Sequence, residues 1–243
     1  IVYNMIMKLD EKFIRLHTGL NVKIAEECDS TFEEIGRNDV IVALRQNRGE
    51  GRGEHTFHSP RGGLYIVMRV MGLHIDPHTL TPAVGLAVHD AIAAILGIQT
   101  GVKWVNDIMY NGKKAVGILC KSPRKAEYLV GVGINYSTHP AEFEKADISD
   151  VACSLDAPES RASAFVTGLI NRIKRATLAA FDNERYGALC VNVGKNVEFT
   201  YNGTRIQGFA ESVAPDGSLI VRIGAATVAV DAGEVSIIRE VKE

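Results

Sequence analysis

A glycine-dense segment between two apolar runs restricts the fold more than any other feature of the chain. Five of the 23 glycines fall within residues 49–63. The apolar runs 39–46 and 63–70 flank this segment, and their pattern predicts buried β-strands. Residues 47–62 contain four glycines, one proline and three arginines, but no apolar run. The sequence therefore predicts a sheet with a connection longer than usual, which favours a functional or mobile loop.

A long apolar segment after this pair predicts a central helix. Thr81 and Pro82 have the residue types of a helix start, a side chain that can accept a backbone N–H followed by proline in the first turn. Residues 83–96 are apolar on nearly all sides, which is typical of a helix packed against a sheet. Gly97 is the expected end of this helix.

The middle of the chain predicts a hairpin, a further strand and an outer helix. Residues 102–110 and 114–121 read as strands joined at Asn111-Gly112, a dipeptide that tolerates positive φ at both positions. Another strand is expected over 126–134. Residues 160–185 carry apolar side chains at helical spacing with Arg and Lys between them, so an amphipathic helix is expected on the outside of the main domain.

After Gly194 the pattern changes to short alternating segments separated by tight turns. Five segments in about 50 residues suggest a small β-barrel or a rolled sheet. They are residues 196–201, 204–213, 218–223, 226–230 and 234–238. We therefore expect two domains, residues 1–189 and residues 190–243.

Composition excludes several classes of protein. The formal net charge of -2 over 243 residues gives no bulk electrostatic argument for binding nucleic acid or membranes. The apolar runs are shorter than the ~18 residues of a membrane span. The four cysteines form no Cys-x-x-Cys pair, and the seven histidines form no metal-ligand motif. These features favour a cytoplasmic protein with reduced thiols.

Five short stretches carry residues suited to chemistry, and each also has a purely structural interpretation. Arg52 in the glycine segment can hold an anion, or the segment is a flexible connection. Residues 103–107 bring together a cation, an amide and a carboxylate, or Trp104 belongs to the core. The other three stretches also have structural interpretations. A solvated turn explains lysines 113–114, a bulge explains the Gly-x-Gly at 131–133, and a helix cap explains the Asp-Ser-Thr at 29–31.

Taken in order, these stretches resemble the catalytic region of biotin protein ligases. The matching segments are Asp29-Ser30-Thr31, Gln46, Gly49-Glu50-Gly51-Arg52, Ser59-Pro60-Arg61-Gly62-Gly63-Leu64-Tyr65, Lys103-Trp104-Val105-Asn106-Asp107, Lys114-Ala115-Val116-Gly117-Ile118-Leu119 and Gly131-Val132-Gly133-Ile134-Asn135. Each motif is weak by itself, but their joint occurrence at compatible spacing is specific. The resemblance implies an α+β fold of the class II aminoacyl-tRNA synthetase-like kind, a mixed sheet flanked by helices, with a small C-terminal β-barrel.

The resemblance also implies a reaction and its site. Biotin and ATP would form biotinyl-5′-AMP and pyrophosphate, and the biotinyl group would pass to a lysine of a biotin carboxyl carrier protein. The implied catalytic residues are Arg52, Lys114 and Asp107, with Mg²⁺ held near Asp107. The implied biotin-binding residues are Ser30, Thr31, Gln46, Gly49, Gly51, Arg52, Lys114, Leu119, Gly131 and Gly133. The implied nucleotide-binding residues are Arg52, Phe57, Lys103, Asn106, Lys114 and Asn135. The loop from Gly49 to His58 would close over the adenylate and exclude water.

Three positions depart from the family pattern. Glu50 replaces an arginine, which reverses a charge beside two anionic substrates. Two outcomes are open: this charge weakens substrate binding or loop closure, or Glu50 points to solvent or pairs with Arg48. Val105 replaces a proline, and Phe32 replaces an asparagine. Around Glu50 the segment 45–63 still carries a net charge of +2.

Several functional expectations stay open. Only 28 residues precede Asp29, too few for the roughly 60-residue DNA-binding domain of some relatives, so no nucleic-acid partner is expected. A lipoate or octanoate ligase and a biotin-binding regulator without transfer activity are the alternatives, and a homodimer is left open. Glu234 and Arg239 are candidates for a contact of the C-terminal domain with carrier or ATP.

Overall fold

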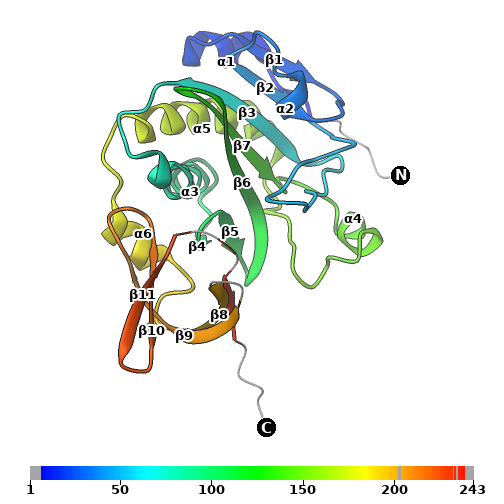
Figure 1. Cartoon of the computed structure of the whole chain (residues 1–243). Coiled ribbons are helices and arrows are strands. Elements are labelled where there is room, and N and C mark those ends of the chain that lie inside the picture. The colour runs from blue at the N-terminus through cyan, green and yellow to red at the C-terminus, as the bar shows by residue number, and fades with distance from the viewer. Residues whose placement is uncertain (1–6, 202–203, 232, 234, 239–243) are drawn as a thin grey trace.

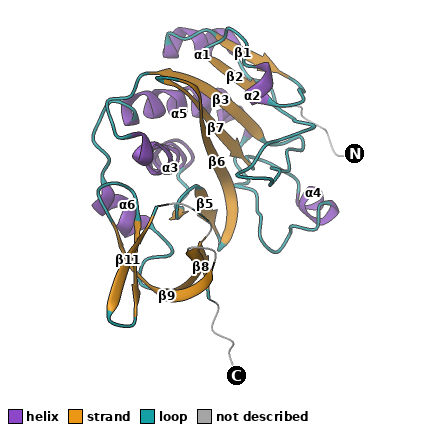
Figure 2. Cartoon of the chain, in the orientation of Figure 1, coloured by secondary structure: helices purple, strands orange, loops and turns teal. Residues whose placement is uncertain are grey.

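The chain folds into two β-sheets with helices packed on the larger one (Figures 1 and 2). This computed structural model describes residues 7–201, 204–231, 233 and 235–238. The larger sheet has seven strands and the smaller one, formed by the C-terminal segment, has five. The expected α+β class is confirmed. The domain boundary near residue 190 remains a prediction, although the chain does pass from one sheet to the other in this region.

The large sheet is mixed and has the strand order β1-β2-β3-β7-β6-β5-β4. Only β1 and β2 pair in parallel, and every other neighbouring pair is antiparallel. The strands are β1 (Val22–Ala25), β2 (Val40–Ala43), β3 (Leu64–Met71), β4 (Gly101–Lys103), β5 (Asp107–Tyr110), β6 (Lys113–Arg124) and β7 (Glu127–Ile134). The predicted strands over 39–46, 63–70 and 126–134 are thus present, each within two or three residues of its expected limits.

Alternation along the central strands gives the two faces of this sheet different characters. In β7, Val130, Val132 and Ile134 belong to the main core, whereas Gly131 and Gly133 between them face the opposite side. Strand β6 alternates in the same way, because Val116 and Ile118 enter the core on either side of Gly117. One face is therefore filled by branched side chains, and the other is left shallow by glycine.

Three helices cover the branched face (Figure 1). They are α1 (Glu11–Thr18), α3 (Leu80–Ala91) and α5 (Ala162–Ala176). Helix α5 buries its apolar stripe, including Phe165, Leu169 and Ile173, against α1 and α3. Burial of each such side chain contributes about 1.5–3 kcal/mol, so this layer supplies much of the stability. The amphipathic pattern predicted over 160–185 is confirmed for α5, but the chain then turns and begins a separate helix, α6 (Asn183–Leu189).

Helix α3 begins earlier than the sequence indicated. A 3₁₀ turn, η1 (Pro77–Thr79), leads directly into it, and Asp76 caps that turn by accepting from the backbone N–H of His78. Thr81 therefore lies inside the first turn and is not the cap. The helix continues as a π-turn, η2 (Ile92–Leu96), and ends at Gly97 with a φ of +74°, as expected.

By length and hydropathy, one helical segment could cross a membrane. It runs over Pro77–Leu96 with a mean hydropathy of 1.5, and 67% of the tested window is buried inside the protein. Its burial between the sheet and α5 fits a core helix.

The predicted strand 102–110 is interrupted. Residues 104–106 form a turn, so β4 and β5 are a tight antiparallel hairpin of their own. The next turn matches the prediction, because Asn111 and Gly112 both have positive φ (48° and 75°) between β5 and β6. The motif at 103–107 is thus presented on a turn at the edge of the sheet.

The C-terminal segment forms an open antiparallel sheet in the order β11-β10-β9-β8-β12. Its strands are β8 (Asn196–Tyr201), β9 (Thr204–Val213), β10 (Leu219–Ile223), β11 (Ala226–Val230) and β12 (Val235–Ile237). All five predicted strands are present. Of the two expected arrangements, a small β-barrel or a rolled sheet, the described residues form an antiparallel sheet that does not close into a barrel. Closure would need the edge strands β11 and β12 to pair, and each of them pairs on one side only.

Two buried groups fix the junction between the sheets. The indole N–H of Trp104 donates to the carbonyl of Gly217 at 2.9 Å, and the backbone N–H of Trp104 donates to Oδ1 of Asn192 at 2.9 Å. Both side chains are buried, at 3% and 0% exposed. The backbone N–H of Val191 also donates to Val102 in β4. The turn at 104–106 is therefore held by residues from the C-terminal part of the chain.

The remaining elements are short and peripheral. They are α2 (Thr31–Glu34), α4 (Pro140–Lys145) and η3 (Glu159–Arg161). The four cysteines are free, as expected for reduced thiols.

Candidate active site

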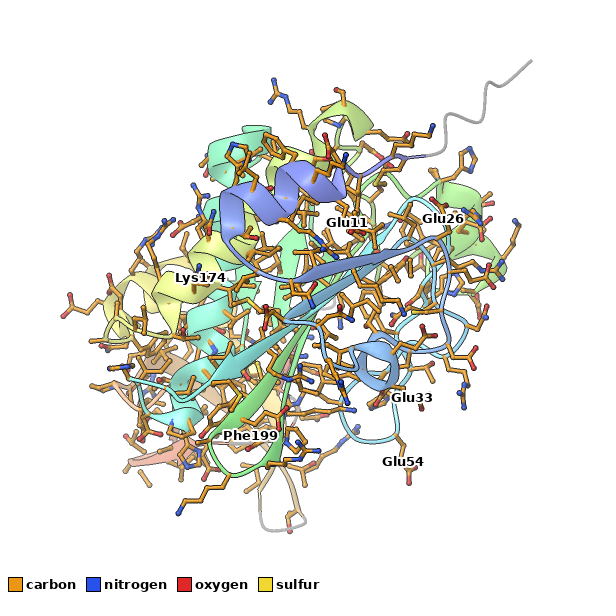
Figure 3. The ribbon with its side chains drawn as sticks, turned by 90° about the horizontal axis from the view of Figure 1, so that it is seen from above. Glu11, Glu26, Glu33, Glu54, Lys174 and Phe199 are labelled. Atoms are coloured by element: carbon orange, nitrogen blue, oxygen red, sulfur yellow. The ribbon has the colours of Figure 1, made fainter. Side chains whose placement is uncertain are left out.

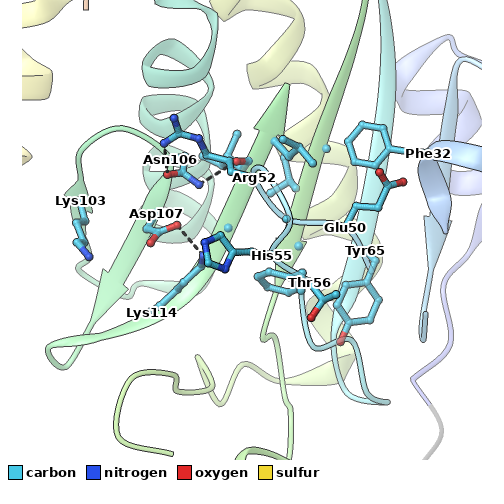
Figure 4. Close-up of a pocket in the computed structure, with 18 of the residues that line it drawn as sticks. Phe32, Glu50, Arg52, His55, Thr56, Tyr65, Lys103, Asn106, Asp107 and Lys114 are labelled. Carbon is cyan, nitrogen blue, oxygen red and sulfur yellow. Dashed lines mark hydrogen bonds and ion pairs between the residues drawn. The ribbon is translucent and has the colours of Figure 1, made fainter. Parts of the chain in front are cut away.

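A pocket of about 200 Å³ lies between the glycine segment, the shallow face of the large sheet and the start of β12. Its two ends are lined by different residues, as Figure 4 shows. We call them the Gln46 end and the Lys114 end. Thr31, Phe32, Gln46 and Glu50 line the Gln46 end, and Ser30 and Lys121 contact Glu50 behind it. Arg52, Lys103, Asn106, Asp107 and Lys114 line the Lys114 end. These residues come from segments up to 91 positions apart in the chain, and the fold brings them together around one cavity.

The glycine segment forms its side of the pocket as a compact turn. The backbone N–H of Gly51 donates to His55 at 2.9 Å, and the N–H of Phe57 donates to Gly49 at 2.9 Å. Gly53 at the tip has a φ of +58°, a conformation that glycine adopts without strain. The long connection predicted between the two strands therefore contains backbone hydrogen bonds of its own.

The floor of the pocket is built from glycines that aromatic side chains cover. A Cβ atom placed on Gly131 would lie 2.4 Å from the ring of Phe32, and one on Gly133 would lie 2.7 Å from the ring of Phe57. Gly117 is also covered by Phe57, at 2.8 Å. The resemblance implied that a ligand ring would lie on Gly131 and Gly133. In this structure two rings of the chain itself occupy that surface.

Hydrogen bonds at the Gln46 end are made within the protein. Oε1 of Gln46 accepts from both the backbone N–H and the hydroxyl of Thr31, each at 2.8 Å. Nε2 of Gln46 donates to Oγ of Ser59 at 3.1 Å. This geometry follows from the backbone, because the chain at Gln46 runs alongside Cys28 in a parallel bridge. Ser30 stands at the N-cap of α2, yet its side chain makes no capping hydrogen bond.

Glu50 lies inside this end of the pocket. Its Oε1 accepts from the Ser30 hydroxyl at 2.7 Å, and its Oε2 forms an ion pair with Nζ of Lys121. The same Nζ lies 4.3 Å from the centre of the Phe32 ring. Burial alone would raise the pKa of Glu50, but the hydrogen bonds from Lys121 and Ser30 outweigh it and lower the pKa. The expectation that Glu50 faces solvent or pairs with Arg48 is therefore wrong.

Three of the four arginines in residues 45–63 pair with carboxylates outside this range. Arg45 pairs with Glu27 at 3.4 Å, and Arg61 pairs with Glu26 at 3.5 Å. Arg48 pairs with Asp29 and Glu33 at 3.0 and 3.1 Å. Figure 3 shows Glu26 and Glu33 on the side of the molecule that carries this segment. The net charge of +2 counted along 45–63 is thus offset in space by acidic residues of 26–34.

Arg52 is the arginine that reaches the Lys114 end. Its Nη1 donates to Oδ1 of Asn106 at 3.4 Å and to the carbonyl of Gly233 at 3.2 Å. Arg52 therefore links the glycine segment to the turn at 104–106 and to the segment before β12.

Lys114 and Asp107 form the centre of this end. Lys114 Nζ lies 2.8 Å from Asp107 Oδ1, and the two side chains are 33% and 17% exposed. Oδ1 is nevertheless buried without a hydrogen-bond donor, so the contact is an ion pair that lacks hydrogen-bond geometry. A buried acceptor of this kind can take a further donor or a cation.

A second pocket of about 310 Å³ adjoins the first across the Lys114–Asp107 pair. The two pockets share five lining residues, Thr56, Phe57, Lys103, Asp107 and Lys114. Asn135 lines the second pocket, and its Nδ2 donates to the carbonyl of Cys153 at 3.0 Å. The side chain of Phe57 thus stands at the boundary between the two spaces.

The fold brings most of the predicted site residues to the first pocket. Those lining it are Thr31, Gln46, Gly51, Arg52, Phe57, Lys103, Asn106, Asp107, Lys114, Leu119, Gly131 and Gly133. Ser30 reaches it through Glu50, and Asn135 lines only the second pocket. Gly49 lies beneath, where an added Cβ atom would be 2.3 Å from the carbonyl of Phe57.

Sequence reasoning missed the residues contributed by distant segments. Lys121 had a signal, because it is two residues after Leu119 on a strand and therefore shares its face. Gly233, Val235 and Ser236 had none, since they enter the pocket from the C-terminal sheet. The candidates Glu234 and Arg239 lie outside the described residues.

Comparison with known proteins finds a matching family model, similar sequences and a similar fold. Residues 25–135 match the model of the biotin/lipoate A/B protein ligase family. The bifunctional ligase/repressor BirA of Bacillus subtilis is 33% identical over 145 residues, which are 54% of this chain and 44% of that protein. The biotin--[acetyl-CoA-carboxylase] ligase of Mycobacterium tuberculosis is 29% identical over 210 residues, 81% of this chain and 77% of the relative. The chain thus spans less than half of the Bacillus protein.

A solved structure shares the fold over nearly the whole chain. The biotin protein ligase of Aquifex aeolicus in complex with biotin and ATP superposes with a TM-score of 0.74 at 24% identity, covering 90% of this chain and 99% of that one. The matched segment 25–135 contains both ends of the pocket except for the residues before β12. Residues 25–135 are therefore similar in sequence to the biotin/lipoate A/B protein ligase family, and nearly the whole chain shares the fold of the Aquifex enzyme.

Proposed function

We propose that the chain is an ATP-dependent biotin protein ligase. It would join biotin and ATP to form biotinyl-5′-AMP and pyrophosphate, and then transfer the biotinyl group to a lysine of a biotin carboxyl carrier protein. One observation carries the proposal, namely that two pockets meet at the Lys114–Asp107 pair. Two adjoining pockets can hold two reactants side by side, and cations at their border can offset the repulsion between two anions.

The residues at this border suit the first step. An oxygen of the biotin carboxylate attacks the α-phosphorus of ATP, and pyrophosphate leaves. Negative charge then accumulates on the phosphoryl oxygens, where preorganised cations lower the barrier most. Lys114 from the sheet and Arg52 from the glycine segment would supply them. Lys114 would exchange its ion pair with Asp107 for the incoming phosphate.

The second pocket would hold the nucleotide. Lys103, Asn106 and Asn135 offer polar groups around it, and Phe57 offers an aromatic face at its border. Because Phe57 now rests on Gly117 and Gly133, a ligand in either pocket would share that surface with it or displace it.

Mg²⁺ would enter with the triphosphate. Oδ1 of Asp107 is buried without a hydrogen-bond donor, which fits a cation ligand. Among the residues that the structure describes, no group of three or more His, Cys, Asp or Glu could hold a metal. One carboxylate together with substrate phosphates is a usual environment for Mg²⁺. Bound there, the ion would offset phosphate charge.

The Gln46 end would hold the ring of biotin. Ser30, Thr31 and Gln46 carry the hydrogen-bonding groups, and Leu119 offers an apolar surface beside Gly131 and Gly133. Gly49 and Gly51 would let the glycine segment approach the bound ligand closely. Closure of this segment would keep water from hydrolysing the acyl-adenylate.

Transfer is the second step. The ε-amine of a carrier lysine, once deprotonated, would attack the acyl carbonyl, and AMP would leave. The carrier is thus the proposed partner, and the cytoplasm, where ATP is available, is the proposed location.

Biotin-dependent exchange of pyrophosphate into ATP tests the first step, with lipoate as the control acid. Exchange with biotin and not with lipoate supports the proposal. Exchange with lipoate alone would favour a lipoate or octanoate ligase instead. Tight biotin binding by calorimetry without labelling of a carrier domain would favour a regulator that does not transfer.

A further inference from the structure

Two departures from the family pattern meet at the Gln46 end of the pocket. Glu50 stands in place of an arginine and Phe32 in place of an asparagine, and both contact Lys121. Lys121 lies on β6 and pairs with Glu50 across 71 positions of the chain. The charge introduced on the glycine segment is therefore balanced from the sheet, inside the pocket.

Glu50 retains capacity to accept hydrogen bonds. A carboxylate offers about four acceptor sites, and the Ser30 hydroxyl and Lys121 ammonium occupy two. By contrast, Oε1 of Gln46 already accepts twice, and its amide nitrogen is used by Ser59. The hydrogen of the Ser30 hydroxyl is committed to Glu50. Glu50 is thus an acceptor at this end with room for a ligand donor, and it lines the pocket.

We propose that Glu50 is a specificity-determining residue whose carboxylate accepts a hydrogen bond from a ring N–H of the acyl substrate. This inference rests on the proposed function. The ureido ring of biotin carries two N–H donors, whereas a dithiolane or an alkyl chain carries none. A donor bound to an ionised acceptor forms a strong, charge-assisted hydrogen bond. A substrate without the donor would cover the carboxylate and leave it unpaired, which disfavours that substrate.

Lys121 and Phe32 act on Glu50 as positioning residues. The Lys121 ammonium holds Oε2 and keeps the carboxylate ionised, because its positive charge favours the anionic form. The Phe32 ring, 4.3 Å from Nζ, supports the ammonium from the floor of the pocket. The orientation of the Glu50 carboxylate is thus set by Lys121 of the sheet and Phe32 of α2, and not by the glycine segment.

Calorimetric titration without ATP tests the proposal on the whole chain. The ligands are biotin and biotin methylated on both ring nitrogens. The variants are Glu50→Ala and Lys121→Met, with Glu54→Ala as the matched control. Glu54 is an exposed carboxylate of the same segment that points away from the molecule (Figure 3). Thermal melting of each variant checks that it is folded.

We expect Glu50→Ala to bind biotin at least tenfold more weakly than the wild type does. Its affinity for methylated biotin should stay within about twofold of the affinity of the wild type for the same ligand. Lys121→Met should weaken biotin binding by a smaller factor, and Glu54→Ala should change neither ligand.

Three outcomes would contradict the inference, and they differ in meaning. If the wild type binds no biotin, the proposed function itself is wrong. If Glu50→Ala binds biotin as the wild type does, biotin recognition stands and the role of Glu50 is wrong. If Glu50→Ala weakens both ligands equally, Glu50 acts only by fastening the glycine segment, and recognition of the N–H group is again wrong.

Discussion

The two ends of the pocket differ in how their polar groups are satisfied. At the Gln46 end, the side-chain amide of Gln46 and the hydroxyls of Ser30 and Thr31 bond to other groups of the protein. At the Lys114 end, a buried carboxylate oxygen of Asp107 has no hydrogen-bond donor. The hydrogen bonds around Gln46 form a complete network, whereas Oδ1 of Asp107 is paired only with the ammonium of Lys114.

The two ends are therefore expected to contribute differently to folding and to the reaction. A finished buried network stabilises the folded protein, because breaking it leaves polar atoms without partners. An incomplete charged site costs stability and is retained where it can act on a substrate. Substitution of Gln46 should therefore affect mainly folding, and substitution of Lys114 should affect mainly the reaction.

The largest effect is expected at Lys114. Lys114→Ala should reduce biotin-dependent pyrophosphate exchange by about 100-fold, because a cation that offsets transition-state charge is lost. Thermal melting checks that the variant is folded, because removal of Lys114 leaves the buried Oδ1 of Asp107 without its ion-pair partner. Lys113→Ala is the control, as the neighbouring lysine bonds to the carbonyl of Ser149 instead. If Lys114→Ala exchanges pyrophosphate at the wild-type rate, Lys114 takes no part in the reaction, and the proposed difference between the two ends of the pocket is wrong.

The next effect concerns folding. Gln46→Ala should lower the free energy of unfolding by about 2 kcal/mol, because it strands the N–H and hydroxyl of Thr31 and the hydroxyl of Ser59. Urea denaturation measures the loss. Gln207→Ala, at an exposed position of β9, should stay within about 0.5 kcal/mol of the wild type. Equal stability of both variants would show that the network at this end is not structural.

A tenfold effect is expected at Arg52. Arg52→Ala should release biotinyl-AMP about ten times faster, because the link from the glycine segment to Asn106 and Gly233 is lost. Filter trapping of radiolabelled adenylate measures the rate. Arg48→Ala, on the same segment but paired outside the pocket, should retain the intermediate as the wild type does. If both variants release biotinyl-AMP at the same rate, residues other than Arg52 retain the adenylate.

The smallest effect is expected from pH at the Gln46 end. The pKa of Glu50 is lowered, so the carboxylate is ionised throughout the range above its ordinary value of about 4.3. The contribution of its ion pair is complete above that value and is lost only as the pH falls through the lowered pKa. Biotin affinity should thus vary by less than about twofold between pH 5.5 and 8. A steep fall between pH 7 and 6 would instead show that a group other than Glu50 controls biotin affinity.

Much of the fold could be predicted from periodicity. The strands β2, β3 and β7 follow from their apolar runs, and the turn at Asn111-Gly112 follows from residues that accept positive φ. The start of α3 was misplaced because Asp76 supplies the cap one turn earlier. Sheet closure could not be predicted, because it depends on whether two edge strands meet and not on the pattern within either.

The site was predictable where its residues form contiguous motifs. Pairings between distant segments were not, and Glu50 is the plainest case, because its partner Lys121 lies on another element. Charge counting along the sequence failed for the same reason, since Arg48 is neutralised by Asp29 and Glu33 in space.

The contact between Trp104 and Gly217 has a practical consequence. The chain has a single tryptophan, so all indole emission comes from one position. That indole borders the pocket and donates its N–H to the C-terminal sheet. A fluorescence titration would therefore follow both pocket occupancy and separation of the two sheets without any attached dye, from a reporter that the fold itself provides.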